Sequence, residues 1–300
     1  MTLKKIRVAV LGSGNIGTDL CERILRDESF ELVAFVGRRS DSPGLARLSG
    51  QSKYILSSGI VGLNPFWGEI DGVFDATSAF DHERHWGILQ AQEKWVIDLT
   101  PSKIGQPFVP ELSNSLDQMT LNTQNCSNYS MVTCGGQSSA PLIFAMAKHS
   151  TGIMEVEVSS SIAALSAGPA TRRNIDQYIS STENLISLIS ECKNVKALLV
   201  LNPSEPPVMM RTTIHMRARF SDLTKIRFES EQIISKINKY VPGYELIIEP
   251  YYSAQDTISA TVKVTGAGYA LPEYAGNLDI INAAAVETAK RHFSQGKKDE

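Results

Sequence analysis

The first hundred residues alternate between short apolar runs and stretches with helical periodicity. The apolar runs are IRVAVL (6–11), ELVAFV (31–36), GVFDAT (72–77) and KWVIDLT (94–100). Short strands that are apolar at nearly every position, separated by helices, are typical of a parallel sheet covered on both faces. The pattern therefore predicts an α/β domain of the doubly wound, dinucleotide-binding type.

Beyond residue 130 the pattern changes, because the apolar runs become longer and partly alternate with polar residues. They are found at 153–162, 196–202, 209–220, 244–252 and 257–266, with helical stretches at 173–190, 227–238 and 276–293. Long alternating strands with fewer intervening helices indicate a mixed or antiparallel sheet with helices on one face. We therefore expect a second, α+β domain.

Composition and charge narrow the class of protein. The 300 residues are 42% hydrophobic and 20% charged, with a net charge of −3. The basic residues are dispersed, which is not the pattern of a nucleic-acid-binding surface. The chain has no apolar run of roughly 18 residues that would span a membrane and no secretory signal after its first methionine. Its 4 cysteines form no CxxC motif, which fits a reducing compartment, so we expect a cytoplasmic protein without a structural metal.

A glycine-rich turn follows the first predicted strand. The sequence from Gly12 to Gly17 reads G-S-G-N-I-G, directly between an apolar strand and a helix. In this context the motif predicts a pyrophosphate site, at which Gly14 allows close approach and the helix N-terminus attracts negative charge. The alternative is an ordinary structural turn. The predicted cofactor contacts are Gly12, Ser13, Gly14, Asn15, Ile16 and Gly17.

The second strand ends in Gly37-Arg38-Arg39-Ser40, with no acid before Asp41. An acid at this place would bind the ribose 2′-hydroxyl of NAD, whereas guanidinium groups favour the 2′-phosphate of NADP. We therefore expect NADP to be accepted and NAD to remain possible. A pair of solvated surface arginines is the alternative.

Cys134 is the candidate nucleophile. It lies in SMVTCGGQSS, where we expect a short strand at 131–133, a turn at Gly135-Gly136 and a helix from Ser138. Helix N-terminal amides favour a thiolate, and the glycines would offer N–H donors to an oxyanion. A lone cysteine is otherwise buried and inert, which is how we interpret the remaining residues Cys21, Cys126 and Cys192.

Polar residues follow the strand at 72–77. Thr77 and Ser78, together with Asp75, either face the cofactor crevice or cap the next helix. His82 and His85 lie in that helix. Because no third ligand stands in a matching motif, we interpret them as part of a solvated helix face rather than a metal site.

These residues together make the chain resemble the acetylating acetaldehyde dehydrogenases, CoA-dependent enzymes that accompany an aldolase of the 4-hydroxy-2-oxovalerate type. The resemblance runs in order over nearly the whole chain. It is carried by VLGSGNIGTDL (10–20), VFDATSA (73–79), VIDLTPSKIG (96–105), MVTCGGQ (131–137), SAGPATRRNID (166–176), LNPSEPPVMMR (201–211), YVPGY (240–244) and LPEYAGNLDI (271–280).

The resemblance implies a fold similar to glyceraldehyde-3-phosphate dehydrogenase. A Rossmann domain (1–130 and 270–300) would be interrupted by a catalytic and dimerisation domain (131–269). It places the thioester-forming cysteine on Cys134 and implies coenzyme A as co-substrate, a short aldehyde, a homodimer and an aldolase partner. Nicotinamide contacts would include Ser166, Ala167, Gly168, Pro169, Asn174 and Asn277. Gln137 and Asn174 would line the aldehyde pocket.

Three departures indicate a divergent member. Thr212 stands where the family has a catalytic acid, Ala170 stands where it tends to have glycine, and Arg38-Arg39 replace an acid-containing turn. Strand alternation places His215 on the face opposite Thr212, so His215 is a poor substitute for that acid. Two other functions stay open: a dehydrogenase or reductase that does not use CoA, and a non-catalytic nicotinamide-binding subunit of an aldolase complex.

Overall fold

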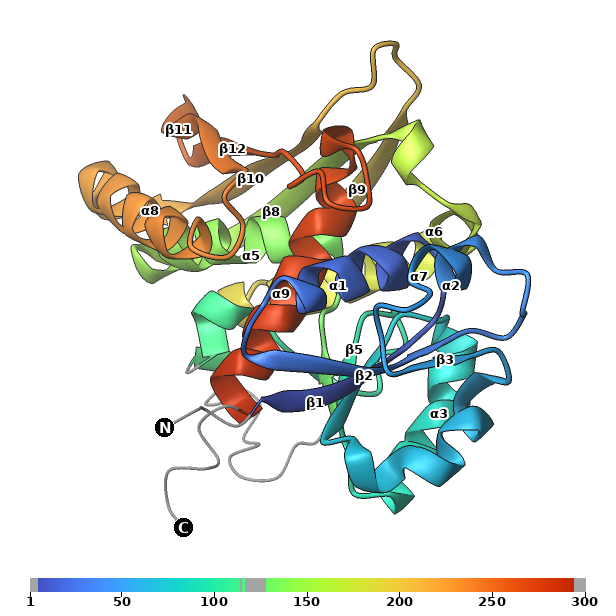
Figure 1. The fold of residues 1–300 in the computed structure, drawn as a ribbon. Helices are drawn as coiled ribbons and strands as arrows, with labels where there is room; N and C mark the ends of the chain where they lie inside the picture. Colours follow the sequence, from blue (N-terminus) through green and yellow to red (C-terminus); the bar gives the residue numbers. More distant parts are fainter. Residues whose placement is uncertain (1–4, 114, 117–127, 294–300) are drawn as a thin grey trace.

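The computed structural model describes residues 5–113, 115–116 and 128–293, with backbone only at 169 and 170. It contains two sheets with helices between and around them (Figure 1). The first sheet is parallel throughout, with strand order β3-β2-β1-β4-β5-β7-β6. Its strands are β1 (Ile6–Leu11), β2 (Phe30–Val36), β3 (Tyr54–Leu56), β4 (Gly72–Asp75), β5 (Trp95–Asp98), β6 (Gln106–Pro107) and β7 (Asn128–Ser130).

Both faces of this sheet are buried, as the uniformly apolar runs predict. Val10 of β1 belongs to a cluster with Leu20 and other residues of the covering helices, while the next residue, Leu11, packs in a cluster with Leu63 on the opposite face. The covering segments are α1 (Asn15–Leu25), α2 (Pro43–Arg47), a 3-10 segment (Gly59–Glu69), α3 (Ala79–Ala91), a short 3-10 turn (Pro110–Leu112) and α9 (Gly276–Phe293).

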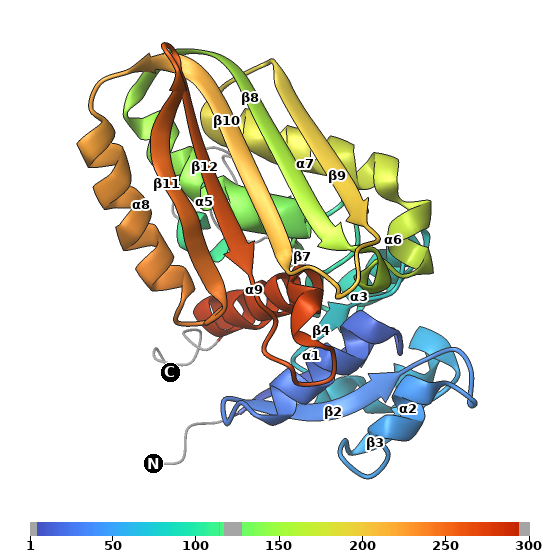
Figure 2. The same ribbon diagram turned by 90° about the horizontal axis from the view of Figure 1, so that it is seen from above.

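The second sheet has five strands in the order β11-β12-β10-β8-β9, and only β8 and β9 are parallel. Figure 2 shows α5 and α7 behind this sheet. Its strands are β8 (Ser150–Ala163), β9 (Val195–Asn202), β10 (Met210–Phe220), β11 (Tyr244–Ala254) and β12 (Thr257–Val264). The helical segments are α5 (Cys134–Lys148), a 3-10 turn (Ala164–Ser166), α6 (Pro169–Arg173), α7 (Ile175–Ser190), α8 (Leu223–Ile237) and a 3-10 turn (Glu273–Ala275).

Strand β10 shows the alternation that the sequence predicts. Thr212 is fully buried on the helix-covered face. The half-buried His215 lies on the other face, where its Nδ1 and the Ser259 hydroxyl form a hydrogen bond of 2.6 Å. His215 therefore lies on the opposite side of the sheet from Thr212, as expected.

The C-terminal helix α9 joins the two parts of the molecule. It packs against α1 and β5 of the first part and against α5 and β12 of the second. Most of its residues from Gly276 to Ala289 are buried. A helix held on several sides is suited to place a side chain such as Asn277 in a fixed position between the two sheets.

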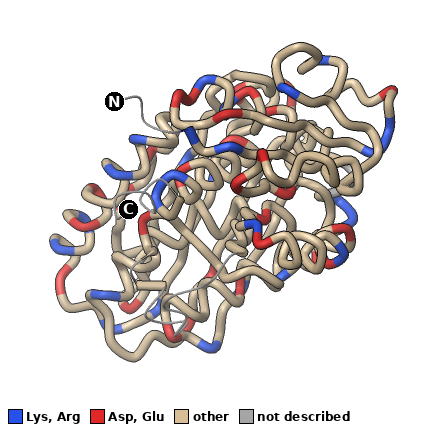
Figure 3. The backbone as a smooth tube through the Cα atoms, turned by 60° about the horizontal axis from the view of Figure 1, so that its bottom comes forward, with Lys and Arg blue, Asp and Glu red and all other residues tan. Residues whose placement is uncertain are grey.

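The surface carries both signs of charge. Figure 3 shows basic and acidic residues interspersed along the described backbone rather than gathered on one face. No helix in the described part of the chain is both long and apolar enough to cross a membrane.

Candidate active site

The glycine turn after β1 has the close contacts that a dinucleotide site needs. Gly12 has φ +104°, and a Cβ on it would lie 2.5 Å from the carbonyl oxygen of Ala76. A Cβ on Gly17 would lie 1.8 Å from the carbonyl oxygen of Gly12. Gly14, by contrast, has no described atom within 4 Å of a Cβ, so the protein leaves its backbone open to a ligand. Helix α1 begins at Asn15, directly after this open position.

The end of β2 packs against this turn. A Cβ on Gly37 would lie 2.6 Å from the hydroxyl of Ser13, and that hydroxyl is 2.7 Å from the hydroxyl of Ser42. The two exposed arginines that follow each have an acidic neighbour. Arg38 lies 3.2 Å from Asp81, and Arg39 lies 2.6 Å from Asp41. Both exposed guanidinium groups thus belong to residues that directly follow the end of β2, where Gly37 packs against the turn.

A cleft lies between the two parts of the molecule. It brings together residues of the dinucleotide turn region, the ends of β4 and β5, and the start of α5, α7 and α9. Six of the predicted site residues line it: Ile16, Thr77, Ser78, Cys134, Asn174 and Asn277. The other lining residues are Ala76, Leu99, Thr100, Pro101, Val132, Thr133, Ile162, Thr171, Tyr178, Leu199, Leu278 and Ile281.

Cys134 is the first residue of α5, which corrects the predicted local structure. The strand before it is Asn128–Ser130 rather than 131–133, and the helix begins at Cys134 rather than at Ser138. The cause is the Thr133 hydroxyl, which caps the helix by accepting from the Gly136 amide at 2.9 Å. Gly135 and Gly136 are therefore helical, and the Gly136 amide is already engaged and does not serve an oxyanion as we expected.

Val132, two residues before Cys134, has φ +58°. The left-handed region is unfavourable for a β-branched residue, and such a conformation costs about 1–3 kcal/mol. The Val132 amide is held by the Ser130 hydroxyl at 3.2 Å. Strain of this kind, next to a candidate nucleophile, is the pattern expected where the backbone must present a side chain in one orientation.

The sulfur of Cys134 has Tyr178 of α7 as a neighbour, with 3.8 Å between sulfur and hydroxyl oxygen. Gly135 makes this approach possible, because a Cβ there would lie 2.2 Å from that hydroxyl. Burial raises the pKa of Cys134 to about 11, against the opposing effect of the Tyr178 hydrogen bond and of the amides of Gly135 and Cys134 itself. The helix-start amides therefore favour the thiolate, as expected, but burial has the larger effect and leaves the pKa of Cys134 above its usual value.

Behind Tyr178 lies a chain of neutral hydroxyl groups. Tyr178 is hydrogen-bonded to Ser160, Ser160 lies 3.1 Å from Thr212, and Thr212 lies 2.8 Å from Ser138. The Ser138 hydroxyl donates to the carbonyl of Gly135 at 3.0 Å. Thr212 is thus connected to Cys134 through this chain, and it is absent from the residues that line the cleft.

Two other predicted residues point elsewhere. The Gln137 amide donates to the carbonyls of Phe108 and Met131 at 2.7 and 3.0 Å, so it fixes the backbone instead of lining the aldehyde pocket. Ser166 donates to the carbonyl of Ala163 at 2.8 Å. Both are buried outside the cleft lining.

Further predicted residues lie in the loop before α6, and two of the cysteines interpreted as structural lie elsewhere in the core. Ala167 is buried and Gly168 half-buried, at the start of the segment that leads into α6. The side chains of Pro169 and Ala170 lie outside the described residues, as does Cys126. Cys21 and Cys192 are free and buried.

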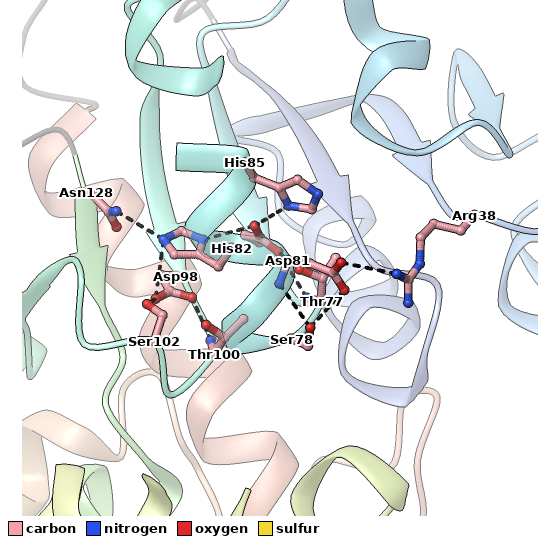
Figure 4. Close-up of polar contacts among 11 residues, drawn as sticks. Arg38, Thr77, Ser78, Asp81, His82, His85, Asp98, Thr100, Ser102 and Asn128 are labelled. Atoms are coloured by element: carbon pink, nitrogen blue, oxygen red, sulfur yellow. Dashed lines mark hydrogen bonds and ion pairs between the residues drawn. The ribbon is translucent and has the colours of Figure 1, made fainter. Parts of the chain in front are cut away.

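The residues after β4 form a polar cluster, drawn in Figure 4. Ser78 caps α3 by accepting from the Asp81 amide at 3.2 Å, and Thr77 donates to Asp75 through its amide at 3.0 Å and through its hydroxyl. Both residues also line the cleft. Ser78 therefore caps the helix and also lines the cleft, while Thr77 lines the cleft and is bonded to Asp75.

The expectation that His82 and His85 belong to a solvated helix face is wrong. His82 is fully buried and lies 3.0 Å from Asp75 and 3.5 Å from Asp98, while His85 lies 2.8 Å from Asp75 (Figure 4). The reason is that α3 packs back onto β5, so this side of the helix faces the strand ends. Among the described residues, no group of three or more side chains is arranged to hold a metal ion.

The cleft fits a nicotinamide cofactor. Asn277 Oδ1 and Thr100 Oγ1 are buried and have no hydrogen-bond partner among the described residues, and both residues line the cleft. Buried polar atoms without partners are unfavourable unless a ligand or water satisfies them. Together with the open backbone at Gly14, they provide polar contacts for a molecule that spans the turn and the cleft.

The arrangement is that of a two-part dehydrogenase, with a Rossmann-like sheet and a cysteine-bearing mixed-sheet part around one cleft. Aspartate semialdehyde dehydrogenase II from Vibrio cholerae, solved with ASA, superimposes with a TM-score of 0.63 over 97% of this chain and 100% of that chain, at 13% identity. At this identity the likeness concerns the fold alone, and it confirms the predicted fold class.

Comparison of sequences is more specific. Residues 134–272 match the family model described as prokaryotic acetaldehyde dehydrogenase, dimerisation. Acetaldehyde dehydrogenase of Spirochaeta aurantia is 44% identical over 97% of this chain and 96% of its own. That of Burkholderia thailandensis is 43% identical over 98% and 96%, and that of Pectobacterium atrosepticum 41% over 94% of each. The chain belongs to the acetaldehyde dehydrogenase family, which confirms the resemblance seen in the sequence.

Proposed function

We propose that this protein is an acylating aldehyde dehydrogenase that converts a short aldehyde and coenzyme A to acyl-CoA with a nicotinamide cofactor, through Cys134. One observation carries the proposal: the Cys134 thiol, at the start of α5, lines a cleft whose other wall is formed by the strand ends of the dinucleotide-binding sheet. The names of the relatives support the same reaction class.

The cofactor would extend from the glycine turn to the cleft. The amides around Gly14 would hold the pyrophosphate, and Asn277, Thr77 and Ser78 would contact the nicotinamide end. When bound, the nicotinamide supplies the hydride acceptor for the oxidation. Arg38 and Arg39, beside the turn, favour acceptance of NADP as well as NAD.

Cys134 would form the covalent bond to the substrate. Addition of its sulfur to the aldehyde carbon gives a thiohemiacetal, oxidation leaves a thioester, and the CoA thiol then displaces Cys134 to give acyl-CoA. The Tyr178 hydroxyl and the amides of Gly135 and Cys134 stabilise negative charge on the sulfur. Thr212 cannot act as a carboxylate base, so the proton leaves the thiol by another route.

The same reasoning extends to the organisation of the protein. We infer two domains, residues 1–130 with 270–300 and residues 131–269, because the strands of the two sheets fall on either side of residue 131. The match to a dimerisation model supports a homodimer. A cytoplasmic location and an aldolase that supplies the aldehyde complete the proposal.

The test is turnover by the purified protein on a panel of short aldehydes with coenzyme A and either NAD or NADP, followed by absorbance of the reduced cofactor. Cys134→Ala is the matched variant. CoA-dependent turnover that disappears in the variant supports the proposal. Turnover without CoA identifies a CoA-independent dehydrogenase, and cofactor binding without turnover identifies a non-catalytic subunit. Mass spectrometry of the acylated Cys134 peptide would establish the thioester.

A further inference from the structure

His82 lies between two carboxylates from neighbouring strands. Asp75 ends β4 and Asp98 ends β5, and the two residues are paired in the parallel register. The imidazole Nδ1 is 3.0 Å from Asp75 Oδ2, and Nε2 is 3.5 Å from Asp98 Oδ2, with all three side chains fully buried (Figure 4). Buried charged groups persist only where partners compensate for the lost hydration. The imidazole is the group that separates these two acids.

In each acid, one carboxylate oxygen faces the histidine and the other accepts a hydrogen bond from a backbone amide in a turn. Asp75 Oδ1 accepts from the amide of Thr77 at 3.0 Å, and Asp98 Oδ1 accepts from the amide of Thr100 at 2.7 Å. Both threonines line the cleft beside Cys134. The orientation of each carboxylate therefore links His82 to one of the two turns that form the wall of the cleft.

We propose that His82 is a positioning residue for cofactor binding: as an imidazolium it holds Asp75 and Asp98 together and so sets the turns 76–78 and 99–101. The inference rests on the proposed function, because it assumes that these turns contact the nicotinamide cofactor. It adds a residue that the covalent chemistry does not use and that lies outside the cleft lining.

The charge state of the imidazole decides how many acids it can hold. An imidazolium has two N–H donors, and a neutral imidazole has one donor and one acceptor. The Asn128 amide nitrogen lies 3.1 Å from Nε2, so the neutral ring can accept there while Nδ1–H stays on Asp75. Loss of the proton therefore keeps the Asp75 contact and removes the donor facing Asp98.

The other groups around the ring also favour an imidazolium that contacts both acids. His85 also faces Asp75 Oδ2, at 2.8 Å, and Ser102 donates to Asp98 Oδ2 at 2.6 Å. Burial by itself would lower the pKa of His82, but the hydrogen bond to Asp75 and the charges of both acids outweigh it and raise that pKa. Burial raises the pKa of Asp98 to about 6. The complete bridge is therefore present above pH 6 and below the raised pKa of His82.

The experiment measures the dissociation constant of the reduced nicotinamide cofactor by its fluorescence, with the full chain, between about pH 5 and about pH 9. The wild-type protein is expected to bind most tightly inside the window of the complete bridge and to weaken above it. His82→Asn keeps a donor near Asp75 but cannot reach Asp98. At neutral pH it should bind about fivefold to tenfold more weakly, because it loses the 3.5 Å ion-pair contact with Asp98, which is weaker than a short charge-assisted hydrogen bond. At alkaline pH it should match the wild-type protein.

Three further variants make the assignment specific. His82→Gln places a neutral donor near Asp98 and should recover part of the affinity without regaining the alkaline weakening. His85→Asn leaves the contact between His82 and Asp98 in place and should keep the alkaline weakening. His215→Asn, on the outer face of the second sheet, is the control for removing a histidine elsewhere.

The outcomes separate this inference from the proposed function. Wild-type affinity and wild-type pH dependence in His82→Asn overturn the inference, as does a lowered melting temperature with an unchanged pH profile. If the His82 variants do not fold, a wild-type profile without alkaline weakening still overturns it. A wild-type protein that binds no nicotinamide cofactor at any pH overturns the proposed function, and the inference with it.

Discussion

The hydroxyl of Tyr178 lies 3.8 Å from the sulfur of Cys134, although the two residues are 44 positions apart and belong to different helices. Burial keeps the pKa of Tyr178 well above its usual value, so the phenol stays a hydrogen-bond donor. Tyr178→Phe should raise the pKa of the Cys134 thiol and lower kcat roughly tenfold to hundredfold, because a hydrogen bond to a charged group is lost. The pH dependence of Cys134 alkylation by iodoacetamide measures the pKa directly.

Ser160→Ala is the control for this experiment. Ser160 contacts Tyr178 but not the sulfur, so its loss should change the thiol pKa much less than loss of the phenol. An equal effect of both substitutions would mean that Tyr178 acts through packing rather than through its contact with Cys134.

The charge of the cofactor should matter for the same thiol. Burial holds the pKa of Cys134 at about 11 in the protein alone, and a nearby positive charge lowers the pKa of an acidic group. Saturation with oxidised cofactor, whose nicotinamide ring is positively charged, should therefore speed alkylation of Cys134 at neutral pH. Reduced cofactor has the same phosphates and a neutral ring, so it is the matched control. Equal alkylation rates with both forms would contradict the expected position of the ring.

The sequence predicts the fold well because burial determines the pattern. Both faces of the first sheet are covered, and its four longest strands coincide with uniformly apolar runs. Buried and more exposed positions alternate along β10, so the opposite placement of Thr212 and His215 also follows from the pattern. These features depend on residues near one another in the chain.

The site is predicted less completely because its contacts are made by the fold. Tyr178 looks like one more apolar position of an amphipathic helix, and nothing local indicates that it meets Cys134. His82 looks like a surface histidine until α3 packs onto the strand ends. The Thr133 cap, which starts the helix at Cys134, has a local signal that we missed: a threonine is a favoured N-cap residue.

Thr212 provides a test of the missing acid. It is fully buried between Ser138 and Ser160, in the hydroxyl chain that reaches Cys134 through Ser160 and Tyr178. Thr212→Asp would place a proton acceptor on that chain and should increase kcat, while its burial should destabilise the fold by about 1–3 kcal/mol. Thr212→Asn has a similar shape without the acceptor charge. A gain shared by both variants would rule out a proton-accepting role.

Arg38 and Arg39 should decide between the two nicotinamide cofactors. Both are exposed and each has an acid neighbour, so they can turn toward a 2′-phosphate without breaking a buried contact. Arg38→Ala with Arg39→Ala should lower kcat/KM for NADP about tenfold or more and leave that for NAD nearly unchanged. Measurement of kcat/KM with each cofactor at low and high salt tests this. An equal loss of kcat/KM for both cofactors would place the arginines away from the 2′-position.

Asp75 and Asp98 should affect stability in opposite directions, although both face His82. Burial opposes ionisation of Asp75, but the hydrogen bonds from His82 and His85 lower its pKa to about 2. Its stabilising effect is therefore full above its unfolded pKa of about 4 and is lost as the pH falls toward 2. Asp75→Asn should cost about 2 kcal/mol at neutral pH, with a shallower loss in acid.

For Asp98 the sign is reversed, because burial raises its pKa to about 6. The folded protein holds this proton more tightly than the unfolded chain, so stability falls as the pH rises from about 4 through 6. Asp98→Asn keeps an acceptor for the Thr100 amide and removes the buried charge, so this fall should be absent and the variant should gain up to about 3 kcal/mol at neutral pH. Urea unfolding of both variants across this range measures the two effects. A shift in the same direction at neutral pH would show that the two acids do not share the histidine in the way the structure indicates.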